Sequence, residues 1–282
     1  MQHQIITQQD IQRLLPPRQP QTHKGDYGKI LLICGSRGYT GAAALAAMGA
    51  LRSGAGVVYL LVPESIYEIE AGKLWESVVI PAPDEEGMLA EAAAQKIEAY
   101  LPKMDAVLIG PGLGQSFGTL SAVETVLRQF DGPVVLDADG INVLAAHKDI
   151  LRDRTAPTIL TPHMGEFVRL GGQNMDDRVQ AAKILSRELD SIVLLKGHRT
   201  VITDGDAVFI NETGNPGMAT GGSGDVLAGV IVSLLGQGLD PLDAAACGAY
   251  LHGAAGDLAA QRIGQYGMLP TDMLQFLPRL LP

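Results

Sequence analysis

The chain has 282 residues, of which 46% are hydrophobic and 18% are charged. Such a chain can bury a large core, either as one α/β domain or as two small ones. Its formal net charge of −10 argues against nucleic acids or anionic membranes as partners, because both require a basic surface. The first residues lack the basic start and apolar run of a secretory signal, and no segment reaches the roughly 18 apolar residues of a membrane span. These features predict a cytoplasmic protein.

Residues 1–26 read as a polar lead-in, in which a helix starting near Thr7 should end before Pro16. From Lys29 onward, short runs with branched residues alternate with longer Ala- and Leu-rich runs. This pattern is typical of a mainly parallel sheet with helices on both faces. The expected strands are 29–34, 57–62, 106–110, 134–138, 158–161 and 192–196. The expected helices are 42–52, 89–101, 119–130, 179–189, 223–235 and 242–260.

Residues 200–204 and 207–211 flank Gly205 and Asp206, so an antiparallel hairpin should follow the last parallel strand. No repeat, low-complexity tract or linker divides the sequence. We therefore expect residues 1–282 to form a single domain. Nothing before Gly25 is long enough to be a further enzyme domain.

The 34 glycines gather where expected strands end, for example at 35–41, 110–114 and 214–224. Ligands of open α/β sheets bind outside the carboxyl ends of the strands, and glycine there lets the backbone approach a ligand closely. Glycine also simply makes tight turns, and for a single cluster the two explanations are about equally good.

The segment 215–236, NPGMATGGSGDVLAGVIVSLLG, carries the strongest chemical signal. Gly222, Ser223 and Gly224 come directly before an apolar helix, whose free first-turn N–H groups are suited to binding an anion. Asp225 would lie in that first turn, where the helix dipole favours its charged form and keeps it available as a proton acceptor. The alternative is that Asp225 only complements the dipole. A helix that needs only a cap does not need a row of glycines, which favours function.

The run GGSGD followed by an apolar helix resembles the anion hole and catalytic aspartate of ribokinase-like enzymes. The longer NPGMATGGSGDVLAG is similar to the signature of NAD(P)H-hydrate dehydratases. Further similar segments follow in order: GDYGKILLICGSRGYTGAAALAAMGALRSGAG at 25–56, IGPGLG at 109–114, LDADGINVL at 136–144, TPHMGEFVRL at 161–170 and LLKGHRTVITDG at 194–205. The resemblance extends from Lys24 nearly to the end of the sequence, and it implies a ribokinase-like α/β fold.

This resemblance implies an ADP- or ATP-dependent (S)-NAD(P)H-hydrate dehydratase, a hydro-lyase that repairs the hydrated cofactors NADHX and NADPHX. The ring hydroxyl would be phosphorylated, and loss of phosphate would regenerate NADH or NADPH. Asp225 would accept the hydroxyl proton, while the backbone of Gly222, Ser223 and Gly224 would support the charge on the transferring phosphoryl group. Mg²⁺ would neutralise the nucleotide phosphates, with ligands that the sequence does not identify.

The resemblance also places the hydrated cofactor against Ala43, Gly114, His163 and Asp225. The nucleotide would bind Gly224 together with the KGHRT stretch: Lys196, Gly197, His198, Arg199 and Thr200. From the residues alone, Lys196 offers a point charge for phosphate, yet a solvated turn of charged residues is an equally good explanation.

Three features near these positions leave alternatives open. Met164 stands where many members of the family carry proline, which puts the geometry of the His163 loop in doubt. Small residues at the start of the 42–52 helix suit either a bound dinucleotide or tight packing. Asp137, Asp139 and Asn142 follow a strand end, where they could hold Mg²⁺ or substrate or cap a helix.

Three other functions compete with the dehydratase. A hydroxyethylthiazole-kinase-type enzyme would share the fold and release a stable phosphorylated product. A dinucleotide-binding dehydrogenase would need GxGxxG after the first strand, and CGSRGYTG does not have that spacing. A non-catalytic nucleotide sensor would not need Asp225 beside three glycines. For the dehydratase we expect a separate NAD(P)HX epimerase as functional partner and, by resemblance, a homotetramer.

Overall fold

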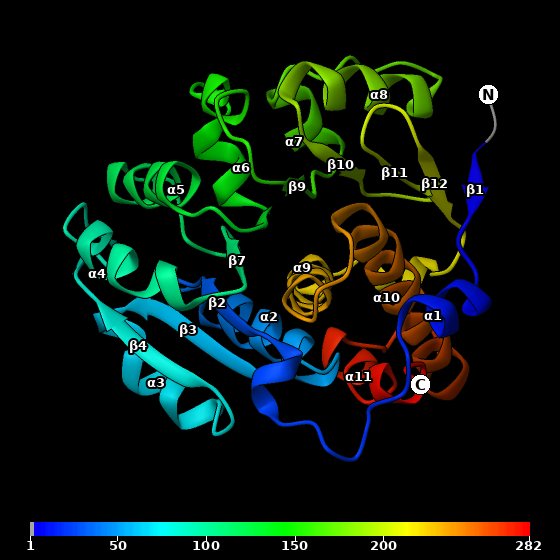
Figure 1. Ribbon diagram of the computed structural model, residues 1–282, viewed down its shortest axis with the longest axis horizontal. Coiled ribbons are helices and arrows are strands. Elements are labelled where there is room, and N and C mark those ends of the chain that lie inside the picture. The colour runs from blue at the N-terminus through cyan, green and yellow to red at the C-terminus, as the bar shows by residue number, and fades with distance from the viewer. Residues whose placement is uncertain (1–2) are drawn as a thin grey trace.

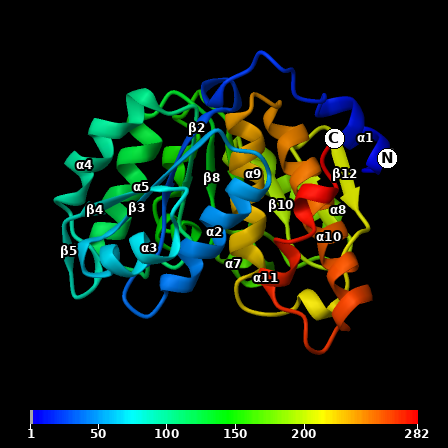
Figure 2. The ribbon, with the colours of Figure 1, turned by 90° about the horizontal axis from the view of Figure 1, so that it is seen from below.

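The computed structural model describes residues 3–282, which are built around a ten-stranded sheet. The strand order is β1-β12-β11-β10-β9-β8-β7-β2-β3-β4, and the six pairings from β10 through β9, β8, β7, β2 and β3 to β4 are all parallel. Helices cover both faces (Figures 1 and 2). The sheet is therefore mainly parallel and flanked by helices on both faces, which confirms the expected fold class.

Every strand that the sequence predicts is present. The parallel strands are β2 (Lys29–Ile33), β3 (Val57–Pro63), β7 (Ala106–Ile109), β8 (Val134–Leu136), β9 (Thr158–Leu160) and β10 (Ile192–Leu195). The antiparallel hairpin is formed by β11 (Thr200–Thr203) and β12 (Val208–Asn211).

Two strands at the edges of the sheet were not predicted. β4 (Val78–Ala82) pairs with β3 at one edge, and β1 (Gln4–Ile5) pairs in parallel with β12 at the other. The segment described as a lead-in thus contributes to the fold. Its helix α1 (Gln8–Leu14) ends before Pro16 as expected, and Ile11 on that helix is fully buried.

The helix expected over 89–101 was wrong at its start. Met88–Leu89 forms strand β6, which pairs with β5 (Asp84–Glu85) in a hairpin, and α4 covers only Ala93–Tyr100. The two residues of the turn, Glu86 and Gly87, both have positive φ. A two-residue turn of this kind joins antiparallel strands tightly, and it overrides the helical pattern of the residues that follow.

Side chains alternate between the two faces along the strands, so the sheet divides the interior into two cores. On β2, Ile30 and Leu32 pack in one core, whereas Leu31 and Ile33 pack in the other. The first core lies against the helices α2 (Thr40–Arg52), α3 (Tyr67–Lys73), α9 (Ser223–Gly236), α10 (Pro241–Ile263) and α11 (Pro270–Met273). The second lies against α4 and the helices α5 (Phe117–Gln129), α6 (Asp139–Leu144), α7 (Met164–Arg169) and α8 (Arg178–Leu189).

Apart from Ser233, helix α9 is apolar on all sides after its first turn, and it is packed between the sheet, α2 and α10. Its backbone approaches α2 so closely that a Cβ atom on Gly229 would lie 2.1 Å from the carbonyl oxygen of Ala46. Glycine is therefore required at this crossing. The contact fixes α9, and with it the segment GGSGD, relative to the sheet.

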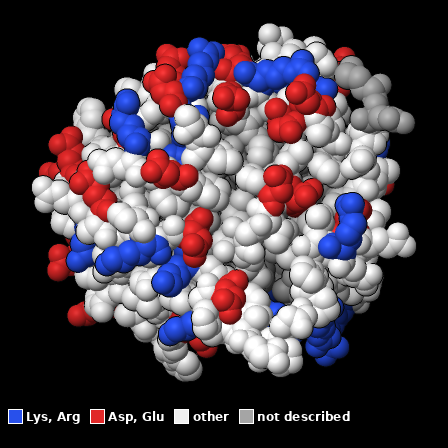
Figure 3. Space-filling view, in the orientation of Figure 1, with Lys and Arg blue, Asp and Glu red and all other residues white. Residues whose placement is uncertain are grey.

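Figure 2 shows the amino-terminal end of α9 at the lower edge of the molecule, beside the loops that follow the parallel strands. The opposite face, seen in Figure 3, carries basic and acidic side chains that are intermixed, without a continuous basic patch. Among residues 3–282 no helix is both long enough and apolar enough to cross a membrane.

Candidate active site

The candidate active site begins with a buried ion pair at the carboxyl ends of three parallel strands. Asp137 follows β8, Thr161 follows β9 and Lys196 follows β10, so the three side chains meet at one edge of the sheet. Lys196 Nζ lies 2.8 Å from Asp137 Oδ1, and the Thr161 hydroxyl donates a hydrogen bond of 2.7 Å to the same oxygen. Asp137 is only 1% exposed.

The charge of Lys196 is therefore already matched by a carboxylate, which the sequence did not show. Burial on its own would lower the pKa of Lys196, but Asp137 and Glu166 outweigh it and raise that pKa above its ordinary value. Lys196 thus remains protonated at neutral pH. Its side chain is 20% exposed and can present part of this charge to a ligand.

Asp225 lies in the first turn of α9 next to this ion pair. Burial, followed by the negative charge of Asp137, raises the pKa of Asp225 to about 6, while Lys196 acts in the opposite direction. The sequence pointed to the helix dipole, which favours the charged form, but desolvation is the larger effect here and the net shift of the pKa is upward. A carboxylate with a pKa near 6 is ionised at pH 7 and is a stronger base than an ordinary aspartate.

The residues of the expected anion hole lie at the start of the same helix, where the Ser223 N–H donates to the carbonyl oxygen of Thr220 (3.4 Å). Gly222 is the N-cap and has φ +96°, a conformation that glycine adopts without strain. The first-turn N–H groups of Gly224 and Asp225 have no acceptor within the helix. A Cβ atom on Gly224 would lie 3.4 Å from Lys196 Nζ, so the free donors adjoin the ion pair.

His163 is the N-cap of α7. Its Nδ1 accepts hydrogen bonds from the backbone N–H groups of Gly165 (3.0 Å) and Glu166 (3.2 Å), which leaves the proton on Nε2. That nitrogen lies 3.3 Å from Glu166 Oε1, and the imidazole is 58% exposed. Met164 occupies the first position of α7, where proline is favoured in helices generally, and the helix and its cap form without it.

Glu166 links His163 to the ion pair, since its other oxygen, Oε2, is 3.9 Å from Lys196 Nζ. Gly114 contacts a second carboxylate: its N–H donates a 2.9 Å hydrogen bond to Asp139 Oδ2. Asp139 is close enough to contribute to the raised pKa of Asp225. Of the expected cofactor-binding residues, Gly114, His163 and Asp225 are therefore connected around one centre.

Ala43 is different. Its side chain is fully buried in α2, and its Cβ would be 2.9 Å from a Cβ built on Gly35. In this conformation the methyl group packs against the protein and is not exposed to a ligand. The role that the family resemblance gives to Ala43 stays a prediction.

A cavity of about 550 Å³ adjoins this centre. Every expected nucleotide-binding residue lines it, namely Lys196, Gly197, His198, Arg199, Thr200 and Gly224. Further lining residues were not predicted as nucleotide contacts: Asn211, Thr213, Gly214, Asn215, Pro216, Met218, Ala219, Ser223, Leu227, Ala249, His252 and Gly253. The apolar members among them can accommodate a flat aromatic base, and the anion hole lies within reach of phosphates.

Arg178 holds the KGHRT loop in place beside this cavity. Its guanidinium donates hydrogen bonds to the carbonyl oxygens of Leu195 (3.1 Å), Lys196 (3.1 Å) and His198 (2.6 Å). Arg199 in turn forms an ion pair of 2.9 Å with Glu212. The loop therefore has a defined conformation before any ligand binds.

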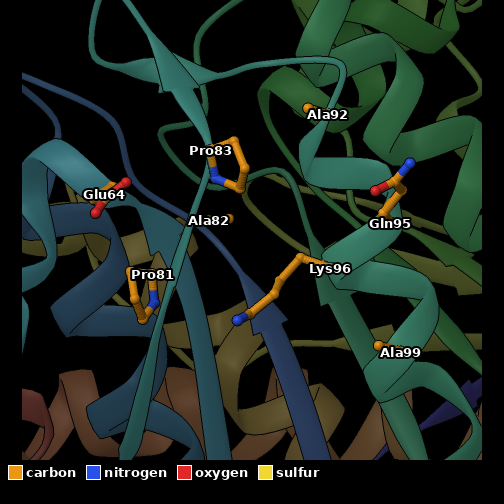
Figure 4. A pocket seen from close by; sticks show the side chains of 8 residues that line it. All are labelled: Glu64, Pro81, Ala82, Pro83, Ala92, Gln95, Lys96 and Ala99. Carbon is orange, nitrogen blue, oxygen red and sulfur yellow. The ribbon is translucent and has the colours of Figure 1, made fainter.

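Within residues 3–282 no group of three or more His, Cys, Asp or Glu side chains is arranged to hold a metal ion. Asp139 and Asn142, which were candidate metal ligands, are bonded to each other through a 3.2 Å hydrogen bond. A second cavity, of about 450 Å³, lies beside β4 and α4 (Figure 4). None of the expected site residues lines it, and its charged side chains are Glu64 and Lys96.

The fold is mainly parallel α/β, and an aspartate with a raised pKa lies beside the expected anion hole and a nucleotide-sized cavity. This combination is that of the ribokinase-like class of enzymes. Comparison with solved structures agrees: a ribokinase-like superfamily protein from Enterococcus faecalis superposes with a TM-score of 0.86 at 28% identity, covering 98% of this chain and 94% of the other.

The ADP/ATP-dependent NAD(P)H-hydrate dehydratase of Bacillus subtilis, co-crystallised with ATP and Mg²⁺, gives a TM-score of 0.84 at 33% identity and covers 99% and 98% of the two chains. The family model for NAD(P)H-hydrate dehydratase matches residues 30–279. The chain belongs to the NAD(P)H-hydrate dehydratase family.

A curated relative, the bifunctional NAD(P)H-hydrate repair enzyme Nnr of Moorella thermoacetica, is 46% identical over 273 residues. The match covers 95% of this chain and 52% of the relative. The chain thus spans about half the length of the curated relatives that it matches.

Proposed function

We propose that this protein catalyses the ADP- or ATP-dependent dehydration of (S)-NADHX and (S)-NADPHX, and so returns damaged nicotinamide cofactor to NADH and NADPH. The observation that carries the proposal is the position of Asp225. A carboxylate with a pKa of about 6 stands in the same helix turn as the free donors of the anion hole, next to the cavity lined by the KGHRT loop.

Asp225 would remove the proton from the ring hydroxyl, so that the oxygen can attack the terminal phosphoryl group of the nucleotide. The N–H groups at the start of α9 would stabilise the negative charge on that group during transfer. Loss of phosphate, together with a proton from the adjacent ring carbon, would then form the ring double bond and regenerate the reduced cofactor. His163 and the backbone of Gly114 would hold the substrate on the side away from the nucleotide.

Mg²⁺, when bound with the nucleotide, would neutralise phosphate charge. Such ions keep several waters and usually take one or two carboxylates besides the phosphates. Asp137 fits this requirement through Oδ2, because Oδ1 is occupied by Lys196 and Thr161, and Oδ2 is 3.9 Å from a Cβ built on Gly224 in the anion hole.

Three further properties belong to the proposal. We propose that the chain acts in the cytoplasm, that it assembles as a homotetramer, and that an NAD(P)HX epimerase is its functional partner and supplies the S epimer. The curated relatives are bifunctional repair enzymes, and the match to this chain covers about half of their length. This supports a functional link to a second repair activity. A vitamin-precursor kinase has less support, because the family model that matches is that of the dehydratase.

The test is to incubate the purified protein with Mg²⁺, ADP or ATP and enzymatically prepared NADHX, and to follow the return of the nicotinamide absorbance. Recovery by the wild type and its loss in Asp225→Asn are expected. Asp243→Asn is a matched control, because Asp243 is also a first-turn acid, on α10, and does not line the cavity. No recovery with either nucleotide would refute the proposed function.

A further inference from the structure

Two side chains in the wall of the nucleotide cavity carry buried polar atoms that have no hydrogen-bond partner. They are Nε2 of His252 and Oγ of Ser223, and each residue is only 8% exposed. Buried polar atoms are nearly always hydrogen-bonded in folded proteins, so each exception needs an explanation. Both residues line the same cavity.

His252 lies on α10, and its neighbours Ala249 and Gly253 line the cavity as well. Burial, assisted by the charge of Lys196, lowers the pKa of His252 to about 4, although a hydrogen bond with the backbone of Ser223 acts in the opposite direction. The imidazole is therefore neutral at pH 7 and offers one donor and one acceptor.

The same surroundings indicate which part of a nucleotide His252 would meet. Lys196 and Ser223, the two residues that influence its pKa, both belong to the end of the cavity where the anion hole lies. The phosphates and the adjoining ribose carry several oxygen atoms that accept or donate hydrogen bonds. Adenine also carries hydrogen-bonding nitrogens, so the choice of the phosphate–ribose part rests on the neighbouring anion hole. Leaving Nε2 and the Ser223 hydroxyl without partners would cost free energy.

We propose that His252 is a nucleotide-binding residue: together with the Ser223 hydroxyl, its imidazole hydrogen-bonds the phosphate–ribose part of ADP or ATP. The inference rests on the proposed function, since it takes the cavity to be the nucleotide site. It goes further by assigning to α10 a direct part in binding. It also explains why a buried nitrogen of His252, Nε2, stands without a partner among the small apolar residues of that helix.

The experiment is calorimetric titration of the protein with ADP and with ATP, both with Mg²⁺ and without the second substrate. His252→Leu removes both ring nitrogens at similar volume and should weaken nucleotide binding about tenfold. His252→Gln places an amide nitrogen near the position of Nε2 and should bind within about threefold of the wild type.

Thermal unfolding without nucleotide distinguishes binding from packing. If His252 serves the ligand, His252→Leu should unfold at the same or a higher temperature than the wild type, because an unpaired polar atom is removed from the interior. Unchanged nucleotide affinity in His252→Leu would overturn the inference. So would equal losses of affinity in the Leu and Gln variants together with a lowered unfolding temperature, because that pattern indicates a role in packing.

Ser223→Ala should weaken nucleotide binding by about threefold to tenfold. Thr158→Val is its matched control: the Thr158 hydroxyl is likewise buried and unpartnered, but it lies on β9 and does not border the cavity. If the wild type binds neither nucleotide, the proposed function itself fails. If the wild type binds and turns over while the His252 variants bind equally well, only this inference fails.

Discussion

Replacing Asp225 by Asn should make the protein more stable and nearly inactive. The carboxylate has a pKa of about 6 in the folded protein against an ordinary value of 3.8. That difference means that the fold disfavours the charged form by about 3 kcal/mol. Asparagine has nearly the same shape and no charge, so Asp225→Asn should gain up to about 3 kcal/mol in the free energy of unfolding at pH 8.

The sign of the pH dependence follows from the raised pKa. The folded wild type binds a proton more readily than the unfolded chain, so it is relatively more stable at low pH, and this advantage is lost as pH rises from about 3.8 to about 6. The stability difference between variant and wild type should therefore be largest above pH 6. It should shrink progressively as the pH falls toward 4.

Urea unfolding of both proteins at pH 8, 6 and 4.5 measures this difference, and other titrating groups cancel in the comparison. In the same samples, turnover should fall by about 10²–10⁴-fold, the usual contribution of a general base. A stability difference that is the same at all three pH values, or a variant less stable than the wild type at pH 8, would refute the assignment of Asp225 as a destabilised base.

Three other substitutions test the surroundings. Lys196→Met should lower the free energy of urea unfolding by about 3–5 kcal/mol, because it leaves the Asp137 charge buried and unpaired. Adding Asp137→Asn should restore most of this stability, and a Lys196→Met variant as stable as the wild type would contradict the buried ion pair. Gly222 has φ +96°, so Gly222→Ala should displace the anion hole and lower kcat by about 10²-fold. Gly221→Ala, which adds a methyl group in open space, should keep the wild-type kcat. Equal effects of the two substitutions on kcat would argue against this geometry. His163→Ala should lose about 1 kcal/mol of cap energy in urea unfolding, while His163→Asn keeps it; both should raise KM for the hydrated cofactor, and an unchanged KM would remove His163 from the substrate site.

The sequence predicted the central strands well because buried parallel strands form unbroken runs of branched residues. The edges were harder. β1 has only two residues, and β4 contains Pro81, which weakens a strand assignment and is tolerated at an edge. The helix expected from residue 89 failed because the turn at Glu86 and Gly87 fixes a hairpin first.

The sequence predicted site residues well where function requires a local backbone shape, as at GGSGD. It predicted them poorly where function depends on partners that are distant in the sequence. Asp137 and Lys196 are 59 residues apart, and no local pattern marks them as a pair. The raised pKa of Asp225 likewise arises from burial and Asp137, neither of which can be seen in the first turn of a helix. His252 occurs in an Ala- and Gly-rich helix, and its missing partner appears only in three dimensions.

The close crossing of α9 and α2 has a consequence for catalysis. Because the backbones touch at Gly229 and Ala46, the start of α9 cannot shift without disturbing α2. The donors that stabilise charge in the transition state are thus oriented during folding, and the free energy of ordering them is not drawn from nucleotide binding. Substrates arrive at a preset electrostatic field, and the amide protons of α9 should be among the last in the protein to exchange with solvent.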